Sequence, residues 1–193
     1  VLQQGANDGW LDIEVDAIWG KGELDIRLYE IYSNVTVGTD IDNVVSTNTI
    51  GTKTYCGRVR DETGNSIYTK NLTVKIVPPL EITGESEDTL TTAIEQDVVF
   101  TVDYKGYVGY DGEYLDELYI KEWDSEQNKY IDVPGSEIVV NHTSSTNSGT
   151  IAFVIPVSAP ASGDYEYHRY YVYIEDRFGN DYEHDVEVEF DRT

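Results

Sequence analysis

Two segments decide the fold: Tyr55-Cys56-Gly57-Arg58-Val59-Arg60-Asp61-Glu62-Thr63-Gly64-Asn65 and Tyr170-Tyr171-Val172-Tyr173-Ile174-Glu175-Asp176-Arg177-Phe178-Gly179-Asn180. Both match the pattern Y-x-x-x-[VI]-x-D-x-x-G-N, and they lie 115 residues apart. The first half of the pattern predicts a strand with one apolar face. The second half predicts a turn in which the Asp caps backbone amides and the Gly takes a positive φ. An alternating strand follows each copy, so the chain contains a duplicated β-hairpin.

The duplication predicts two domains. Pro78 and Pro79 follow the first copy, and neither can donate a hydrogen bond to a sheet, so we place the boundary there. Domain 1 is then 1–78, with an N-terminal arm over 1–9, and domain 2 is 79–193. Short alternating segments rich in Val, Ile, Thr and Tyr favour strands, and no segment has a capped period of 3.6 residues. We predict an all-β chain of two tandem Greek-key sandwiches with about seven strands each.

The hairpin resembles a known family. The ending G-T-x-x-Y-x-x-x-V-x-D-x-x-G-N, which begins here at Gly51, resembles the F–G hairpin of immunoglobulin-like repeats in extracellular and cell-surface proteins, particularly microbial ones. The resemblance covers both domains. It places Tyr55 and Tyr170 at the corner tyrosine of that family, and Gly57 and Val172 at its disulfide position, which implies that the inter-sheet disulfide is absent. Such a motif implies a fold rather than an activity.

The composition limits the partners. A net charge of −24 and a pI near 4.1 argue against nucleic acid or an anionic membrane as a partner. No apolar run is long enough to span a membrane, and no signal peptide is visible. The charge fits an extracellular protein, a calcium-loaded one or one from a salty medium. Because the sequence starts at Val1 and has no Met, we expect a processed or excised piece of a longer precursor.

Catalytic motifs are missing from the sequence. It has no H-E-x-x-H, nucleophile elbow, P-loop, dinucleotide fingerprint or C-x-x-C. His142, His168 and His184 are scattered. The alternation turns His168 and His184 inward, which favours a position near the sandwich end over metal binding. The single cysteine, Cys56, is expected on a solvent-facing side of its strand. We therefore expect no enzyme and no cofactor other than calcium.

The calcium prediction rests on one acidic loop. Calcium prefers several oxygen ligands, and the densest cluster of them lies in the B–C loop, beside the F–G turn. The candidate ligands are Asp111, Glu113, Asp116, Glu117 and Asp176. The alternative interpretation is a solvated acidic loop without an ion.

The aromatic residues predict a binding face. The outward positions of strands C and F in domain 2 carry Tyr119, Trp123, Tyr167, Tyr171 and Tyr173. Strand G beside them carries carboxylates. Tyrosine and tryptophan stack on sugars and anchor protein interfaces. The alternative is cross-strand aromatic pairing that only stabilises the sheet.

Domain 1 is short of an opening strand. Val1, Leu2, Gln3 and Gln4 are all that is available for it, so domain 1 either lacks its own first strand or uses these residues as a short edge strand. In the first case the N-terminal arm of a neighbouring subunit could add a strand. N-x-[ST] sequons at Asn34, Asn71 and Asn141 are candidate glycosylation sites.

These features favour a non-catalytic extracellular structural protein. Its most specific form is a building block of a cell surface, appendage or filament, assembled by N-terminal strand exchange with copies of itself. The alternative is an adhesin or carbohydrate-binding module that uses the aromatic face on another surface protein or a glycan.

Overall fold

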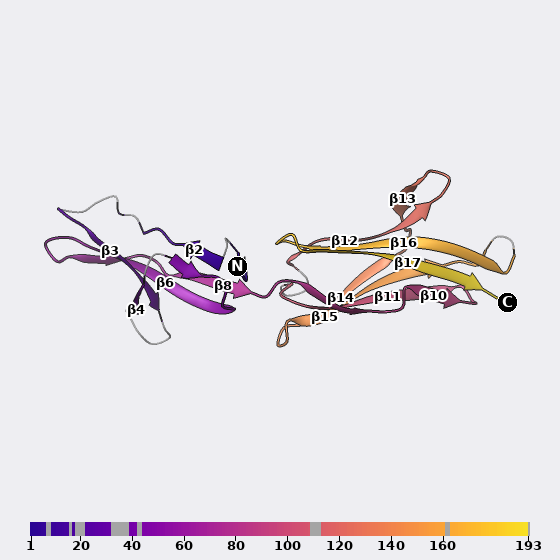
Figure 1. Cartoon of the computed structure of the whole chain (residues 1–193), viewed down its shortest axis with the longest axis horizontal. Coiled ribbons are helices and arrows are strands. Elements are labelled where there is room, and N and C mark those ends of the chain that lie inside the picture. The colour runs from indigo at the N-terminus through magenta and orange to yellow at the C-terminus, as the bar shows by residue number, and fades with distance from the viewer. Residues whose placement is uncertain are drawn as a thin grey trace. The chain divides into compact units, whose positions relative to one another are not determined.

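The computed structural model describes residues 1–6, 9–15, 17, 22–31, 39–41, 44–108, 113–160 and 163–192. Two compact units make up the chain, Val1–Pro78 and Pro79–Thr193, and every regular element in the described residues is a β-strand (Figure 1). The all-β prediction is confirmed. The described residues contain no helix with the length and apolar character needed to cross a membrane.

The second unit is a sandwich of two sheets. Their strand orders are β10-β17-β16-β12-β13 and β14-β15-β11-β9. The strands are β9 (Glu81–Glu85), β10 (Thr89–Thr92), β11 (Gln96–Lys105), β12 (Leu115–Asp124), β13 (Lys129–Asp132), β14 (Glu137–Thr143), β15 (Ser148–Val157), β16 (Tyr165–Asp176) and β17 (Asp181–Asp191). The order β9-β11-β15-β14 is the A-B-E-D sheet of an immunoglobulin-like fold, and β12-β16-β17 is its C-F-G sheet. The chain changes sheets between β9 and β10, which pairs in parallel with β17.

Alternating residues of both sheets form the core of this unit. Phe100 and Phe153 face each other across the β11–β15 pair, with ring centroids 6.4 Å apart. Val172 from the repeated hairpin is also fully buried. Other fully buried members are Val102, Ile151, Ile155, Ile174, Val186, Val188 and Phe190. Removal of this apolar surface from water is the main stabilising contribution to the unit.

The first unit contains the same hairpin, but its second sheet has only two strands in the described residues. Its larger sheet has the order β1-β8-β6-β3-β4, with β7 paired to β6, and β2 pairs with β5 in a second, two-stranded sheet. The strands are β1 (Leu2–Gln3), β2 (Trp10–Asp12), β3 (Asp25–Ile31), β4 (Thr39–Ile41), β5 (Val44–Ser46), β6 (Gly51–Arg60), β7 (Ser66–Tyr68) and β8 (Leu72–Val77). Within the described residues, no strand lies beside β2 as β9 lies beside β11 in the second unit.

One residue of this hairpin differs from its prediction. Cys56 was expected to face solvent, and it is buried. It lies opposite Tyr29 in the β3–β6 pair, and the Arg58 guanidinium stacks over the Tyr29 ring at 5.4 Å, so this face of the sheet is covered. Burial also raises the pKa of the Cys56 thiol, which disfavours its reactive thiolate form.

The two turns of the repeat have the predicted geometry. The Asp61 and Asp176 amides each donate to the Asn carbonyl four residues later, at 3.0 Å in both copies. The Asp side chains accept from the same Asn amides, at 2.9 Å in both. Gly64 has a φ of 89° and Gly179 a φ of 82°, a region that favours glycine.

Candidate functional site

The predicted aromatic residues lie together on the outer face of the β12-β16-β17 sheet. Tyr119 pairs with Tyr173 across β12 and β16, and Lys121 pairs with Tyr171. On the next strand, Asp185 lies opposite Tyr171 and Glu183 lies opposite Tyr173. Alternation explains the arrangement, because successive residues of a strand face opposite sides of its sheet.

Five rings on this face form a continuous run, which we call the aromatic ladder: Tyr173, Tyr119, Tyr171, Tyr130 and Trp123. Tyr119 stacks on Tyr173 with centroids 5.0 Å apart and lies 6.2 Å from Tyr171. Tyr130 lies 5.3 Å from Tyr171 and 5.1 Å from Trp123. The Lys121 ammonium lies 4.5 Å from the centroid of the Tyr119 ring, a cation–π contact.

Tyr130 is the ladder member that the sequence prediction missed. It belongs to β13, the edge strand, and links Trp123 to the tyrosines of β16. Its place follows from the pairing of Trp123 with Tyr130 across β12 and β13. Alternation within one strand gives no register between β13 and β12, so the sequence did not place Tyr130 on this face.

Carboxylates accept hydrogen bonds from three of the four ladder hydroxyls. The Tyr171 hydroxyl donates to Glu183, the Tyr173 hydroxyl to Glu175 at 3.0 Å, and the Tyr130 hydroxyl to Asp185 at 3.2 Å. The hydrogen bond to Glu175, with some burial, raises the pKa of Tyr173 to about 12, so this phenol is neutral at physiological pH. These three rings are therefore held by their hydroxyls, and every ring of the ladder contacts at least one other.

A hollow adjoins the ladder where β12 leaves β16 to pair with β13. Its volume is ≈ 630 Å³, within the usual range of small-ligand sites. Trp123 and Tyr167 supply its aromatic surface, and Tyr167 is 45% exposed. The remaining lining includes four carboxylates, an imidazole and a guanidinium: Glu122, Asp124, Glu126, Glu166, His168 and Arg169.

The imidazole and the guanidinium of the hollow are each paired with carboxylates. His168 Nδ1 lies 2.6 Å from Glu122, and its Nε2 lies 3.5 Å from Glu166. The hydrogen bond to Glu122 is the main cause that raises the pKa of His168 above its usual value. Arg169 donates to Asp185 at 2.5 Å. The hollow thus combines aromatic surface with oriented donors and acceptors, a chemistry suited to binding polar ligands.

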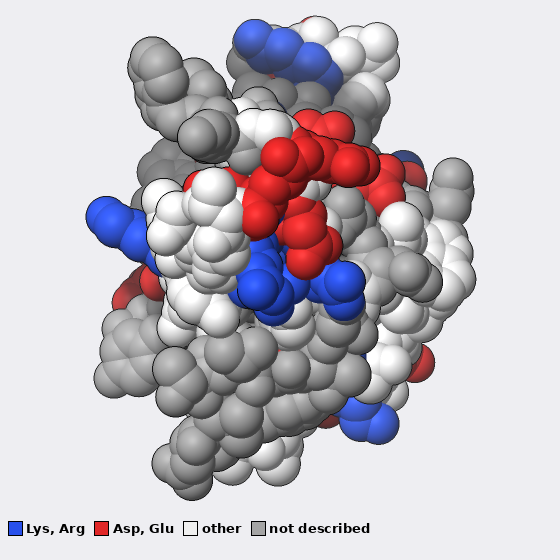
Figure 2. All heavy atoms as spheres, turned by 90° about the vertical axis from the view of Figure 1, so that its left-hand side faces the viewer, with Lys and Arg blue, Asp and Glu red and all other residues white. Residues whose placement is uncertain are grey.

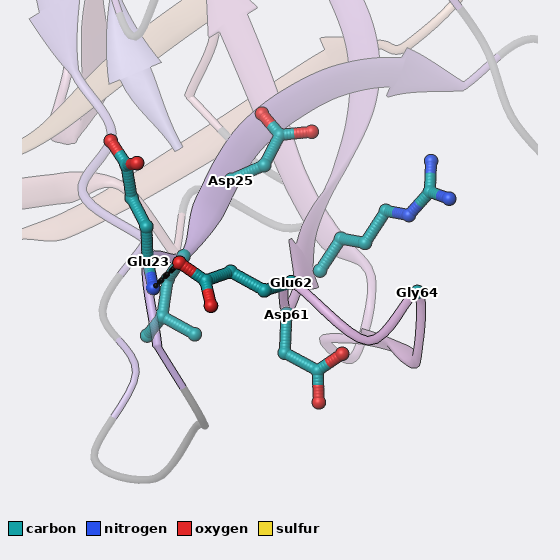
Figure 3. A pocket seen from close by; sticks show the side chains of 7 residues that line it. Glu23, Asp25, Asp61, Glu62 and Gly64 are labelled. Atoms are coloured by element: carbon teal, nitrogen blue, oxygen red, sulfur yellow. Dashed lines mark hydrogen bonds between the residues drawn. The ribbon is translucent and has the colours of Figure 1, made fainter.

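A second hollow, of ≈ 490 Å³, lies in the first unit (Figure 3). Glu23, Asp25, Asp61 and Glu62 line it with Arg60, and Figure 2 shows Asp and Glu side chains gathered next to Lys and Arg side chains on the face turned to the viewer. Two of these carboxylates already accept hydrogen bonds from neighbouring protein groups. Asp25 accepts from Arg27 at 2.9 Å and from Arg58 at 2.8 Å, and Glu62 accepts from the Glu23 amide at 3.0 Å. Because its described lining contains no aromatic residue, this hollow is the weaker candidate.

The calcium candidates do not form a cluster in the described residues. Asp111 lies outside them. Glu113, Asp116, Glu117 and Asp176 are described, but no three carboxylate or imidazole ligand atoms among them converge. Asp176 is buried, and both of its carboxylate oxygens already accept hydrogen bonds within the turn. The donors are the Phe178 amide and the amide and side chain of Asn180. Calcium binding by this loop stays a prediction.

The N-terminal candidates lie within their own unit. Leu2 and Gln3 form β1 and pair in parallel with Ile76 and Val77, and the Gln4 amide donates to the Val77 carbonyl at 2.8 Å. This is the edge-strand arrangement, the second of the two interpretations of the sequence. Asn71 and Asn141 are exposed, as glycosylation requires, whereas Asn34 lies outside the described residues.

Comparisons with known proteins give similarity in fold without a family. No model of a known protein family matches the chain, and no curated protein does. Among solved structures, an I-band fragment of titin is 9% identical, with a TM-score of 0.43, over 87% of this chain and 54% of the fragment. Immunoglobulin domains 1–4 of Sidekick-1 are 13% identical, with a TM-score of 0.46, over 86% of this chain and 40% of theirs. The first two domains of Rst are 13% identical, with a TM-score of 0.47, over 77% of this chain and 66% of theirs.

The chain therefore spans about half the titin fragment and less of the Sidekick-1 structure. The immunoglobulin-like fold of this chain rests on the strand order of its own sheets.

Proposed function

We propose that the chain is a non-catalytic module of an extracellular or cell-surface protein, and that its second unit binds a partner through the aromatic ladder and the adjoining hollow. The observation that carries the proposal is the unbroken contact of five rings beside a hollow lined by Trp123 and Tyr167. Microbial surface proteins are the setting that the repeat pattern favours. The absence of catalytic motifs from the sequence supports a binding role.

A glycan is the partner that the chemistry of this surface favours. The ladder is already ordered, so a sugar ring that stacks on it costs little side-chain entropy. The carboxylates and the Arg169 guanidinium of the hollow could bond sugar hydroxyls. An anionic partner is disfavoured because β17, beside the ladder, carries a row of four carboxylates: Glu183, Asp185, Glu187 and Glu189.

Glycan-array binding by the full chain tests this function. Replacing Trp123 and Tyr171 together with alanine removes the middle ring of the ladder and the end ring that lines the hollow, and each loss is expected to weaken binding by about 2 kcal/mol. Trp10→Ala is the matched control, because Trp10 is an exposed tryptophan of the first unit. Binding that survives the double substitution, or that falls equally with Trp10→Ala, would contradict the proposed face.

A second candidate function is assembly by strand addition in the first unit. β2 pairs with β5 alone among the described residues, and a groove of ≈ 400 Å³ lies along it. Leu11, Ile13, Leu72 and Val74 give the groove an apolar lining, and Val1 and Leu2 lie at it. An open edge next to apolar surface favours pairing with another strand. The N-terminal arm would leave its place in β1 and add to a neighbouring copy.

Electron microscopy of the purified protein tests this second function. Strand exchange predicts concentration-dependent filaments, and deletion of residues 1–7 should abolish them. Filaments that persist after the deletion would exclude exchange of this arm. Absence of filaments from the intact chain at high concentration would also count against it, while leaving the aromatic face untouched.

A further inference from the structure

Three side chains of the second unit converge from distant parts of the chain. Glu85 is the last residue of β9, Asp88 lies in the connection to β10, and His184 lies near the start of β17. Each offers one ligand atom, and these atoms lie within 4.8 Å of one another. In the described residues, this is the one group of three or more His, Cys, Asp or Glu side chains that meets this geometry.

The pairwise geometry centres on the imidazole. His184 Nε2 lies 2.9 Å from Asp88 Oδ1, and His184 Nδ1 lies 3.9 Å from Glu85 Oε2. In the described part of the chain, His184 is the ion-pair partner of both carboxylates, and neither is paired with Lys or Arg. Two carboxylates with one imidazole therefore leave a local excess of negative charge, which attracts a cation.

The imidazole is held in place by its neighbours. Its ring stacks on the buried Phe100 at 5.5 Å with an interplanar angle of 4°. On the same strand, Tyr182 stacks with it at 6.0 Å and 5°. The Tyr182 hydroxyl also donates to Glu85 and orients that carboxylate. Outer groups of this kind, which fix the ligands, are typical of metal sites.

The backbone around Asp88 is anchored as well. The Glu187 amide donates to the Asp88 carbonyl at 2.7 Å, and Ser86 and Thr101 exchange two hydrogen bonds at 2.9 and 3.0 Å. A hollow of ≈ 430 Å³ opens beside Asp88 and His184, so an ion and its water ligands could enter from solvent. The side chains of His184, Glu85 and Asp88 are 23%, 37% and 64% exposed, which keeps the group accessible.

We infer that Glu85, Asp88 and His184 form a binding site for a late first-row divalent cation, with Zn²⁺ as the best match. Zn²⁺ accepts imidazole nitrogen and carboxylate oxygen together and commonly leaves a fourth position to water. Calcium and magnesium are oxygen-seeking, so they gain little from the imidazole. This site is separate from the acidic loop that the sequence suggested for calcium.

The site would join the two sheets of the unit. β9 belongs to the sheet of β11 and β15, whereas β10 and β17 belong to the opposite sheet. An ion held by Glu85, Asp88 and His184 fastens the crossing segment to β17. Binding to the folded state alone raises the stability of that state, so zinc is a regulator of the rigidity of this unit.

Titration of the full chain with zinc tests the inference. After treatment with a chelator and dialysis, isothermal calorimetry should detect one high-affinity Zn²⁺ per chain, and the thermal midpoint should rise with zinc. The same concentration of Ca²⁺ should leave the midpoint unchanged. His184→Gln and Asp88→Asn should each weaken zinc binding by roughly tenfold or more. Asp88 is largely exposed, so Asp88→Asn is the variant that keeps the fold intact.

His168→Gln is the matched control. His168 also lies between two carboxylates, Glu122 and Glu166, but in the described residues these three side chains do not bring one ligand atom each within 4.8 Å of one another, as the His184 group does. Zinc affinity that is retained in His168→Gln and lost in the two site variants supports the site. Zinc affinity unchanged in Asp88→Asn, equal losses in all three variants, or no zinc binding by the intact chain would each overturn it.

Discussion

The two units share a hairpin and differ in what is packed against it. At matched positions 115 residues apart, the second unit has the fully buried Val172 and the first has Gly57. A Cβ atom at Gly57 would lie 2.5 and 2.7 Å from the methyl groups of Val15. In the first unit, Val15 therefore packs directly against the backbone of β6. The hairpin sets the topology, while the residue at this position sets how far a neighbour can approach.

The same contrast extends to the second sheet. The second unit has four strands there, with β9 and β14 at the edges, and the first unit has β2 and β5 in its described residues. In its described part, the second sheet of the first unit has fewer strands to cover the larger sheet, so we expect it to bury less apolar surface there. We expect the second unit to be the more stable of the two, and exchanges at matched positions can test that view.

The largest effect is expected from Val172→Gly. It removes a fully buried side chain from a filled core and should lower the free energy of unfolding of the second unit by about 3 kcal/mol. The reverse exchange, Gly57→Val, should destabilise the first unit by about 1–3 kcal/mol, because the new side chain collides with Val15. Hydrogen exchange measured by mass spectrometry on β16 and β6 peptides of the full chain separates the two units.

This comparison would fail if Gly57→Val raised the free energy of unfolding of the first unit. It would mean that the first unit has room for the larger residue and that Val15 can move away. A double variant, Gly57→Val with Val15→Ala, distinguishes the cases, since removal of the clash should recover part of the lost stability.

A smaller effect is expected at the turn aspartates. Asp176 is buried, so Asp176→Ala leaves the Phe178 and Asn180 amides without their acceptor and should cost about 1–3 kcal/mol. Asp61→Ala should cost less, because water can replace the side chain at an exposed turn. Chemical denaturation of each variant gives the difference. Equal losses would show that burial of the turn is unimportant.

Much of the fold could be predicted because its causes are local. Alternation fixed which side of β12, β16 and β17 each residue occupies, and that placed Tyr119, Tyr171 and Tyr173 on one face. The turn chemistry of Asp61 and Asp176 followed from the D-x-x-G-N pattern alone. Cys56 was predicted wrongly because alternation reports the side of a sheet and not whether another residue covers that side.

The candidate sites depended on contacts that no local pattern contains. Tyr130 joins the ladder through the register of an edge strand. Glu85 and Asp88 meet His184 across almost a hundred residues, because β9 and β10 flank the segment that crosses between sheets. In the sequence this segment shows only several acidic residues before β11, and it contains no alternating pattern that predicts β10. A histidine in an inward position of strand G, with acids before strand B, is the signal that could have suggested the pairing.

The smallest predicted effect concerns an ion pair that occurs at matched positions in the two units. The carboxylate is a glutamate in both, but its partner is a lysine in the first unit and a histidine in the second. Lys53 lies 3.3 Å from Glu30 in the first unit, and at the matched positions His168 lies 2.6 Å from Glu122 in the second. Both pairs flank the corner tyrosine, since Glu30 lies opposite Tyr55 and Glu122 opposite Tyr170. Lysine keeps its charge throughout the neutral range, whereas histidine does not.

This difference should make only the second unit sensitive to pH near neutrality. The pKa of His168 is raised in the folded state, mainly by its hydrogen bond to Glu122, so folding favours the protonated imidazole. The resulting stabilisation is fully present below the unfolded pKa of about 6.5 and is lost as the pH rises through the folded value. The loss should be about 0.5–1 kcal/mol, as for a partly exposed pair.

Hydrogen exchange of β16 peptides from pH 6 to pH 8.5, corrected for intrinsic exchange rates, measures this loss, with β6 peptides as the internal reference. His168→Lys copies the pair of the first unit into the second, and because its ammonium stays charged, the pH dependence of β16 should disappear. If the exchange of β16 peptides still depended on pH in His168→Lys, another titratable group would be responsible. If the corrected exchange rates of β6 peptides changed with pH as much as those of β16 peptides, the net charge of the chain, rather than the His168–Glu122 pair, would set the pH dependence of stability.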